Sequence, residues 1–147
     1  MRRFGDPRRQ DRKYTLRPGA YAILLRGDEM LITHQSGEFD EYQLPGGGID
    51  SGETGSVALH REVMEETGWK ISRPTRIGAY RRFTYMPEYD LWAEKICHIF
   101  AARPVRKIGP PLEPDHEAIW TDAGTACRIL CNSGDRHFVS RYFRLGK

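Results

Sequence analysis

The chain has 147 residues, with 39% hydrophobic and 29% charged residues. These values are typical of one globular domain and exclude a disordered or collagen-like chain. The net charge of +3 is too small to require a nucleic-acid partner. The longest apolar run, Ala20–Leu25, is far too short to cross a membrane, and no apolar segment follows Arg2-Arg3 as in an export signal. Since the three cysteines show no disulfide framework either, we expect a cytoplasmic protein with no membrane partner.

Basic residues are concentrated at the N-terminus. Residues 1–17 hold seven basic residues against two acidic ones, a local net charge of +5. They show no hydrophobic periodicity, and Pro18-Gly19 reads as a break. We therefore expect a solvated, frayed basic arm over 1–17 and a single domain over 18–147. The alternative for the arm is a segment that meets polyanions.

The predicted elements alternate between strands and helices. Ala20–Leu25 is typical of a buried strand, and a turn at Gly27-Asp28 leads to a partner strand at Met30–His34, so a hairpin is expected. A helix is expected from the N-cap Thr54 to Thr67, ended by Gly68. Later strands are expected at 76–86, 93–102 and 117–121, a loop at 103–114, and helices at 122–130 and 134–145. This order predicts an α/β sandwich around a mixed β-sheet.

One helix face carries a cluster of carboxylates. Glu62, Glu65 and Glu66 lie within about 100° of one another on a helical projection. Like charges at this spacing destabilise a helix by about 0.2–0.5 kcal/mol per pair, and a divalent cation would relieve them. The glycines that follow Pro45 add carbonyl oxygens and let a phosphate approach. A solvated acidic surface, supported by an Arg61–Glu65 pair, is the alternative.

This stretch resembles the Nudix box, G-x5-E-x7-R-E-U-x-E-E-x-G-U, in which U is a bulky apolar residue. Every defined position over residues 47–69 matches, in the order Gly47, Glu53, Arg61, Glu62, Val63, Glu65, Glu66, Gly68 and Trp69. Nine positions with fixed gaps make a specific signal. The order of strands on either side is also similar to that of the family, over most of 18–145.

The resemblance implies a Nudix-type α/β/α sandwich and a hydrolase that uses Mg²⁺ or Mn²⁺. Its substrate would be a nucleoside diphosphate linked to another moiety. The metal ligands implied are Glu62, Glu65, Glu66 and the carbonyl of Gly46 or Gly47. Arg61 would orient the glutamates through an ion pair, and Glu53 would support the loop or the metal shell.

The resemblance does not fix the general base. Glu62 is one candidate, and the other candidates are acidic residues of a later loop, namely Glu113, Asp115 and Glu117. Glu117 is favoured because it begins the predicted strand that ends at Trp120. We expect His116 to be incidental.

Substrate contacts are expected in residues 80–92, where aromatic residues alternate with arginines. A purine would stack on Phe83 or Tyr85, and Arg81 and Arg82 would hold phosphate. Gly47 and Gly48 would allow the substrate to approach the backbone. The alternative for this segment is a strand that is half core and half exposed.

The substrate class is left open by two conflicting features. In the Nudix family, a tyrosine about 16 residues past the box resembles a mark of dinucleoside polyphosphate hydrolases, and Tyr85 lies there. A proline nearby resembles a mark of ADP-sugar hydrolases, and Pro87 lies two residues further on.

Three functional hypotheses follow. The favoured one is a hydrolase of small nucleotides, such as dinucleoside polyphosphates, ADP-sugars or (d)NTPs. A hydrolase of nucleotide-capped RNA 5′ ends is the second, for which the basic arm would help. The third is a non-catalytic nucleotide-sensing module, which would not need the complete carboxylate set. The sequence leaves a homodimer open.

Overall fold

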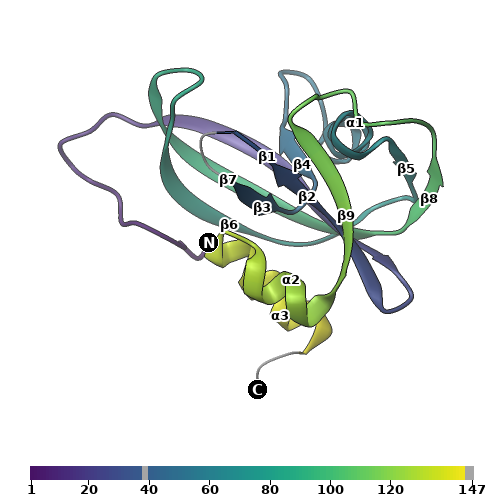
Figure 1. Ribbon diagram of the computed structural model, residues 1–147. Helices are drawn as coiled ribbons and strands as arrows, with labels where there is room; N and C mark the ends of the chain where they lie inside the picture. Colours follow the sequence, from purple (N-terminus) through teal and green to yellow (C-terminus); the bar gives the residue numbers. More distant parts are fainter. Residues whose placement is uncertain (38–39, 145–147) are drawn as a thin grey trace.

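The computed structural model describes residues 1–37 and 40–144 (Figure 1). These residues form a seven-stranded sheet and a separate two-stranded sheet. The main sheet has the order β3-β2-β1-β7-β6, with β4 also paired to β1 and β9 to β2. Its strands are β1 (Thr15–Arg26), β2 (Glu29–Gln35), β3 (Glu41–Gln43), β4 (Gly46–Gly48), β6 (Thr75–Met86), β7 (Leu91–Ala102) and β9 (His116–Asp122). The helices are α1 (Gly55–Thr67), α2 (Ala123–Ile129) and α3 (Ser133–Phe143).

The central strand β1 makes the sheet mixed. It runs parallel to β7 and antiparallel to both β2 and β4. The predicted hairpin is confirmed, because Arg26 and Glu29 close the β1–β2 ladder around a glycine with φ of 59°. The expected helix over 134–145 corresponds to α3, and residue 145 lies outside the described residues. Among the helices that the structure describes, none is long and apolar enough to cross a bilayer.

Alternate residues of β1 face different helices. Ala22 and Leu24 pack in one core cluster with Leu59 and Val63 of α1. Ile23 belongs to a second cluster, which α2 and α3 cover. Figure 1 shows α1 on one side of the sheet and α2 and α3 on the other. The predicted α/β/α sandwich is therefore confirmed.

Local signals set the ends of α1. The Thr54 hydroxyl accepts a hydrogen bond from the Val57 amide at 3.1 Å, a cap that is worth about 1 kcal/mol. At the other end, Gly68 takes a left-handed conformation with φ of 76°, which stops the helix. The predicted helix boundaries are confirmed, so the carboxylates on α1 have the helical spacing expected of them.

Two expectations about prolines are wrong. β1 begins at Thr15 and continues through Pro18. The Pro18 carbonyl faces β4 and accepts a hydrogen bond from the Ile49 amide at 3.0 Å. The N–H that proline lacks would point to the same side, beyond the last β1–β4 pair at Gly19 and Gly48. The proline therefore costs the sheet no backbone hydrogen bond. The expected loop 103–114 contains β8 (Pro104–Lys107), which pairs with β5 (Trp69–Ile71) in the small sheet. Pro104 is tolerated because it is the first residue of an edge strand.

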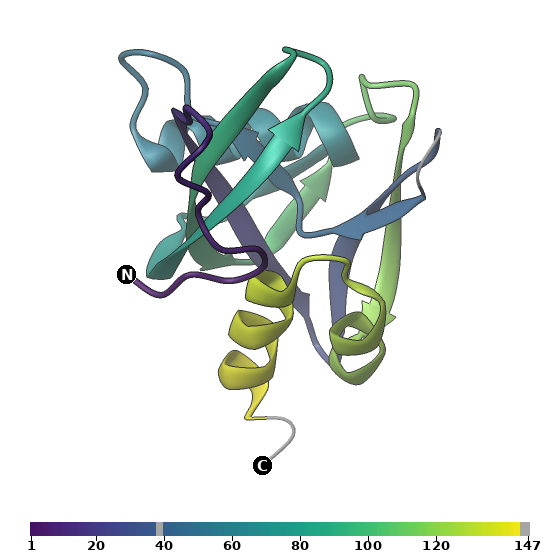
Figure 2. The ribbon, with the colours of Figure 1, turned by 90° about the vertical axis from the view of Figure 1, so that its left-hand side faces the viewer.

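The basic arm is attached near both of its ends rather than frayed (Figure 2). The Arg81 amide donates to the Arg2 carbonyl at 2.9 Å, and the Phe4 amide donates to the Arg81 carbonyl at 2.9 Å. Residues 2–4 therefore extend the sheet beyond β6. At the other end of the arm, the ring of Tyr14 lies 4.8 Å from that of Phe83. Most residues between these attachments are exposed, which keeps their positive charges in solvent.

Candidate active site

Two glycines let α1 approach the backbone of β4. Gly46 has φ of 148°, and a Cβ atom there would overlap the carbonyl of Ala20. A Cβ atom at Gly47 would overlap the carboxylate of Glu62. Because β4 is also paired to β1, the glycines hold one edge of the sheet directly against the acidic face of the helix.

Glu66 is the most deeply buried of the α1 carboxylates, with 7% of its surface exposed. One oxygen accepts a hydrogen bond from the Gly46 amide at 3.0 Å, and the other lies 3.4 Å from His116 Nε2. Burial raises the pKa of Glu66 well above its ordinary value, although the Gly46 N–H opposes the rise. The nearby Glu62 carboxylate raises the pKa further. The site is therefore strained by negative charge when Glu66 is ionised.

Two overlapping groups of side chains surround Glu66. Glu62, Glu65 and Glu113 have ligand atoms within 4.8 Å of one another, and so do Glu66, Glu113 and His116. Glu113 belongs to both groups because the Leu112 amide donates to the Glu65 carbonyl at 2.8 Å and fixes its loop against α1. Burial also raises the pKa of Glu62, which the Arg61 guanidinium opposes.

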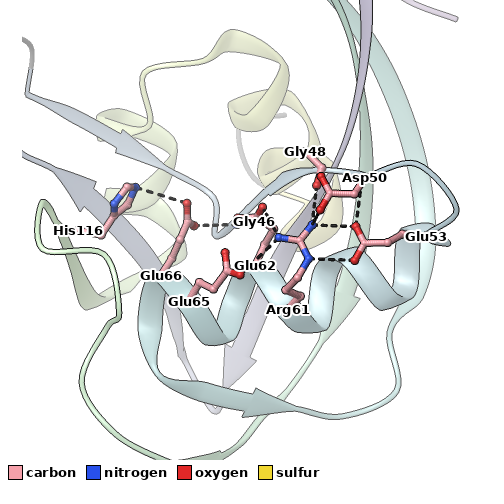
Figure 3. A network of polar contacts seen from close by, with 9 residues as sticks. All are labelled: Gly46, Gly48, Asp50, Glu53, Arg61, Glu62, Glu65, Glu66 and His116. Atoms are coloured by element: carbon pink, nitrogen blue, oxygen red, sulfur yellow. Dashed lines mark hydrogen bonds and ion pairs between the residues drawn. The ribbon is translucent and has the colours of Figure 1, made fainter. Parts of the chain in front are cut away.

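Arg61 connects the helix to the loop before it (Figure 3). It donates to both oxygens of Glu53 at 2.9 and 2.8 Å, to Glu62 at 2.9 Å and to the Gly48 carbonyl at 3.1 Å. A longer ion pair of 3.5 Å reaches Glu65. Hydrogen bonds from Arg61 lower the pKa of Glu53 to about 2, so the Glu53–Arg61 ion pair stays charged at neutral pH. Arg61 thus fixes the direction of the Glu62 carboxylate, and Glu53 balances the positive charge of Arg61.

The donor set fits a hard divalent cation. Four carboxylates converge, and the charge of Arg61 is already balanced by Glu53. Carboxylate and backbone carbonyl oxygens are the ligands that Mg²⁺ and Mn²⁺ prefer. A cation would offset the repulsion that raises the pKa of Glu62 and Glu66. The acidic cluster can therefore hold a divalent metal ion.

The structure brings most of the predicted site residues together. Those on β4, on α1 and on the loop between them form one contiguous network: Gly46, Gly47, Gly48, Glu53, Arg61, Glu62, Glu65 and Glu66. Glu117 is not brought to this network. It is exposed on β9, opposite His34, while its neighbour His116 faces α1.

Sequence reasoning passed over His116 and preferred Glu117 to Glu113. The period of a strand sends neighbouring residues to opposite faces, so only one of His116 and Glu117 can reach α1. Ala118 and Trp120 pack against the α1 cluster, and His116, two residues before Ala118, lies on the same face of the strand. That alternation was the signal available in the sequence, but apolar residues on both faces of β9 left it ambiguous.

The predicted substrate residues on β6 do not form one site. Arg81 pairs with Glu94 at 2.9 Å, Phe83 packs on Tyr14, and the Tyr85 hydroxyl donates to Asp90. These three share one face of β6, beside the N-terminal arm. Arg82 points to the opposite face, into a polar pocket.

Known proteins resemble this chain in sequence and fold. The chain matches the NUDIX domain family over residues 15–142. An 8-oxo-(d)GTP phosphatase of Mycolicibacterium smegmatis is 29% identical over 117 residues, which cover 79% of this chain and 34% of that protein. An RNA pyrophosphohydrolase of Sulfurovum sp. is 38% identical over 61 residues, which cover 38% of this chain and 39% of that protein. The chain thus spans less than half the length of these curated relatives.

The fold is shared with solved structures at low sequence identity. A NUDIX hydrolase from Nitrosomonas europaea superposes with a TM-score of 0.71 and 18% identity, covering 88% of this chain and 90% of that chain. This likeness concerns the arrangement of the sheet and helices. Since the family match extends over residues 15–142 and includes the complete box over residues 47–69, from β4 through α1 to Trp69, the chain belongs to the Nudix family.

Proposed function

We propose that this protein is a divalent-metal-dependent hydrolase that cleaves a pyrophosphate bond in a nucleoside diphosphate linked to another moiety. The observation that carries the proposal is the convergence of Glu62, Glu65, Glu66 and Glu113 beside the glycines of β4. A purely solvated acidic surface would leave these carboxylates apart in water. Here Glu66 is buried and bonded to the backbone of β4, which supports a binding role.

The residues divide the work of phosphate hydrolysis. Mg²⁺ or Mn²⁺, when bound, would neutralise charge on the bridging oxygens and lower the pKa of a coordinated water. Glu62, Glu65 and Glu66 would hold the cation, together with the carbonyl of Gly46 or Gly47. Arg61 would keep Glu62 aligned through their 2.9 Å contact. The bare glycine backbone of β4 would let the phosphates lie close to these ligands.

Glu113 is our proposed general base. It belongs to both groups of ligating side chains, and 43% of its side chain is exposed, so a water can reach it. His116 Nδ1 lies 2.9 Å from its carboxylate, which places Glu113 close to the group around Glu66. A base must lie within hydrogen-bond reach of the attacking water, and the position of Glu113 beside Glu62 and Glu65 suits that requirement better than the exposed position of Glu117.

A substrate panel with product identification tests the proposal. Dinucleoside polyphosphates, ADP-sugars and (d)NTPs would be incubated with the protein and Mg²⁺, and the cleaved bond identified by mass spectrometry. We expect Glu62→Gln, Glu66→Gln and Glu113→Gln each to reduce turnover by about 10²-fold or more while the fold is kept. Glu117→Gln, matched in charge, should stay within about threefold of the wild type. Binding of panel members without turnover would instead identify a nucleotide-sensing module.

The arm supports a second candidate, hydrolysis at RNA 5′ ends. The guanidinium of Arg12 lies 3.6 Å from the ring centroid of Trp92, and that of Arg17 lies 4.5 Å from that of Tyr89. Cationic side chains beside aromatic rings suit the phosphates and bases of a single strand. One relative, from Sulfurovum sp., is named an RNA pyrophosphohydrolase.

Salt dependence distinguishes the RNA candidate from the first one. Each phosphate contact with a single strand contributes about 0.7 to the slope of log K against log salt concentration. Replacing Arg8, Arg9 and Arg12 by Gln should lower that slope by about 2 for a 5′-triphosphorylated oligonucleotide. A slope that is unchanged by the triple variant would rule out the arm as an RNA-binding segment.

A further inference from the structure

A polar pocket lies on the face of the sheet opposite α1. Its cavity of about 30 Å³ is lined by residues from β1, β6, β7 and α3, including Tyr21, Tyr80, Arg82, Lys95 and Asp135. Tyr21 packs with the cluster under α2 and α3, whereas its neighbours Ala20 and Ala22 pack under α1. The pocket is therefore separated from the carboxylates of α1 by the thickness of the sheet.

Two cations sit side by side in this pocket. Arg82 and Lys95 are directly opposite each other in the β6–β7 ladder, so their side chains leave the same face. Over residues 1–37 and 40–144 neither side chain has an ion pair, and Arg82 Nε is buried without a hydrogen-bond partner. Burial and the charge of Arg82 lower the pKa of Lys95. Arg81 Nε, on the other face, is also buried without a well-aligned hydrogen bond, but it has a counter-charge, because Glu94 Oε2 lies 2.9 Å away.

The carboxylate in the pocket does not balance these charges. Asp135 is 2% exposed and already accepts a hydrogen bond from the Tyr80 hydroxyl at 2.7 Å. One carboxylate against two cations leaves an excess positive charge of one. Like charges opposite each other in a sheet are destabilising, and a buried donor without an acceptor destabilises the fold further. A ligand oxyanion would give Arg82 Nε an acceptor and would balance the excess charge beside Lys95, whose Nζ otherwise lies over the ring of Tyr21 at 5.6 Å from its centroid.

The pocket is adjacent to the strand that carries the active site. Tyr21, which lines it, is paired in the β1–β4 ladder with Gly46, whose amide binds Glu66. Neighbouring strands are about 4.8 Å apart, so the pocket begins one strand away from β4, on the other face of the sheet. A cavity of about 30 Å³ has room for one or two waters and is too small for a purine ring.

We propose that Arg82 and Lys95 bind a compact oxyanion, a phosphate or a carboxylate, that the substrate carries outside its scissile pyrophosphate. The proposal deepens the proposed hydrolase function and rests on it. It assigns the substrate to acidic nucleoside diphosphate derivatives, such as those of sugar acids or of phosphorylated nucleosides. Neutral nucleotide sugars, which lack this oxyanion, leave the excess positive charge of the pocket unbalanced and are poorer substrates.

Two matched substrate pairs test this assignment and separate the sources of the oxyanion. UDP-glucuronate and UDP-glucose differ in a carboxylate, and NADP⁺ and NAD⁺ differ in a phosphate. We expect the wild type to prefer the acidic member of one pair by about tenfold or more in kcat/KM, as one added ion pair provides. Arg82→Gln and Lys95→Gln should each remove this preference and leave the neutral member within about threefold.

Arg76→Gln is the matched control, because Arg76 is an exposed arginine of the same strand. It should keep the full preference for the acidic member. No preference in either pair, or a preference that survives in both Arg82→Gln and Lys95→Gln, would overturn the proposal. Both variants remove a like-charge contact, so their melting temperatures should equal or exceed that of the wild type. If one of them fails to fold, the other carries the same test.

Binding without metal separates this proposal from the proposed hydrolase function. The same four nucleotides would be titrated by calorimetry into the wild type and both variants in the presence of EDTA. Tighter binding of the acidic member that is lost in the variants supports the pocket, even if none of the four is hydrolysed. Hydrolysis without discrimination in either assay refutes the pocket and leaves the hydrolase intact.

Discussion

Replacing Gly47 by Ala should impair catalysis without unfolding the protein. A Cβ atom at this position would lie 2.5 Å from Glu62 Cδ, whereas ordinary van der Waals contact begins at 3.4 Å. The carboxylate must therefore retreat by about 1 Å, which it can do because it ends a flexible side chain. A misplacement of about 1 Å in a reacting constellation costs about 10²-fold in rate. The loss of its hydrogen bond to Arg61 would cost about 1.5–3 kcal/mol at most.

The assay for Gly47→Ala is turnover of the best panel substrate, measured across a Mg²⁺ titration and beside urea unfolding. We expect kcat to fall by about 10²-fold and the Mg²⁺ midpoint to rise, with a cooperative unfolding transition retained. Gly48→Ala is the comparison for substrate approach, because a Cβ atom there meets nothing within 4 Å and leaves Glu62 in place, so its Mg²⁺ midpoint should stay that of the wild type. Turnover of Gly47→Ala within about threefold of the wild type would refute the reasoning that Glu62 must lie against β4.

Three further predictions concern the support of the site. Gly46→Ala should prevent folding, because its Cβ atom meets the backbone of β1 and its φ is positive; a soluble variant with a wild-type melting temperature would contradict this. Glu53→Gln should lower the melting temperature at pH 7, because the variant loses the ion pair with Arg61. The pKa of Glu53 is about 2 in the folded protein against an ordinary 4.5, so the difference in melting temperature should disappear as the pH falls from 4.5 towards 2. The difference should also shrink in 0.5 M salt. Tyr80→Phe should cost about 1–3 kcal/mol in urea unfolding, because the buried Asp135 carboxylate loses one of its donors and keeps Asn132; an unchanged free energy of unfolding would show that the bond contributes nothing.

The features that the sequence predicted well are local ones. The α1 helix depends on a cap at Thr54 and a glycine at its end, and both act within one turn. Its carboxylates converge because the helical period places residues three and four apart on one face. The β1–β2 hairpin depends on a short turn with a glycine. None of these features needs knowledge of distant contacts, so a single sequence is sufficient.

The features that were missed depend on pairings between distant segments. β8 forms only because β5, more than 30 residues earlier, offers it an edge. The arm is ordered at residues 2–4 because the outer edge of β6 has free backbone groups. The choice between His116 and Glu117 required the register of β9 against β2. Propensity and composition carry no information on such registers, which explains these errors.

The Arg82–Lys95 pair could have been found from the sequence. The turn at 87–90 joins two strands, and Met86 is paired with Leu91 at its base. Counting back by equal steps from a four-residue turn at 87–90 places Arg82 opposite Lys95, whereas the predicted start of the second strand at residue 93 left this register undefined. The interpretation of 80–92 as alternating aromatic and basic residues grouped Arg82 with Arg81, although adjacent residues of a strand face opposite ways. The alternation of side chains along a strand would have placed Arg81, which pairs with Glu94, and Arg82, which has no ion pair among the described residues, on opposite faces.

The pairing of Tyr21 with Gly46 gives the two halves of the proposed site a common strand edge. On one face of the sheet, the Gly46 amide holds Glu66, and on the other, Tyr21 lines the cationic pocket. A side chain at position 46 would collide with β1, so this edge is kept bare backbone. In the proposed hydrolase, bond cleavage and recognition of the acidic group would lie on opposite faces of the sheet. If both proposals hold, substitutions at Arg82 and Lys95 should change which substrate is accepted while the arrangement of the carboxylates of α1 stays as it is.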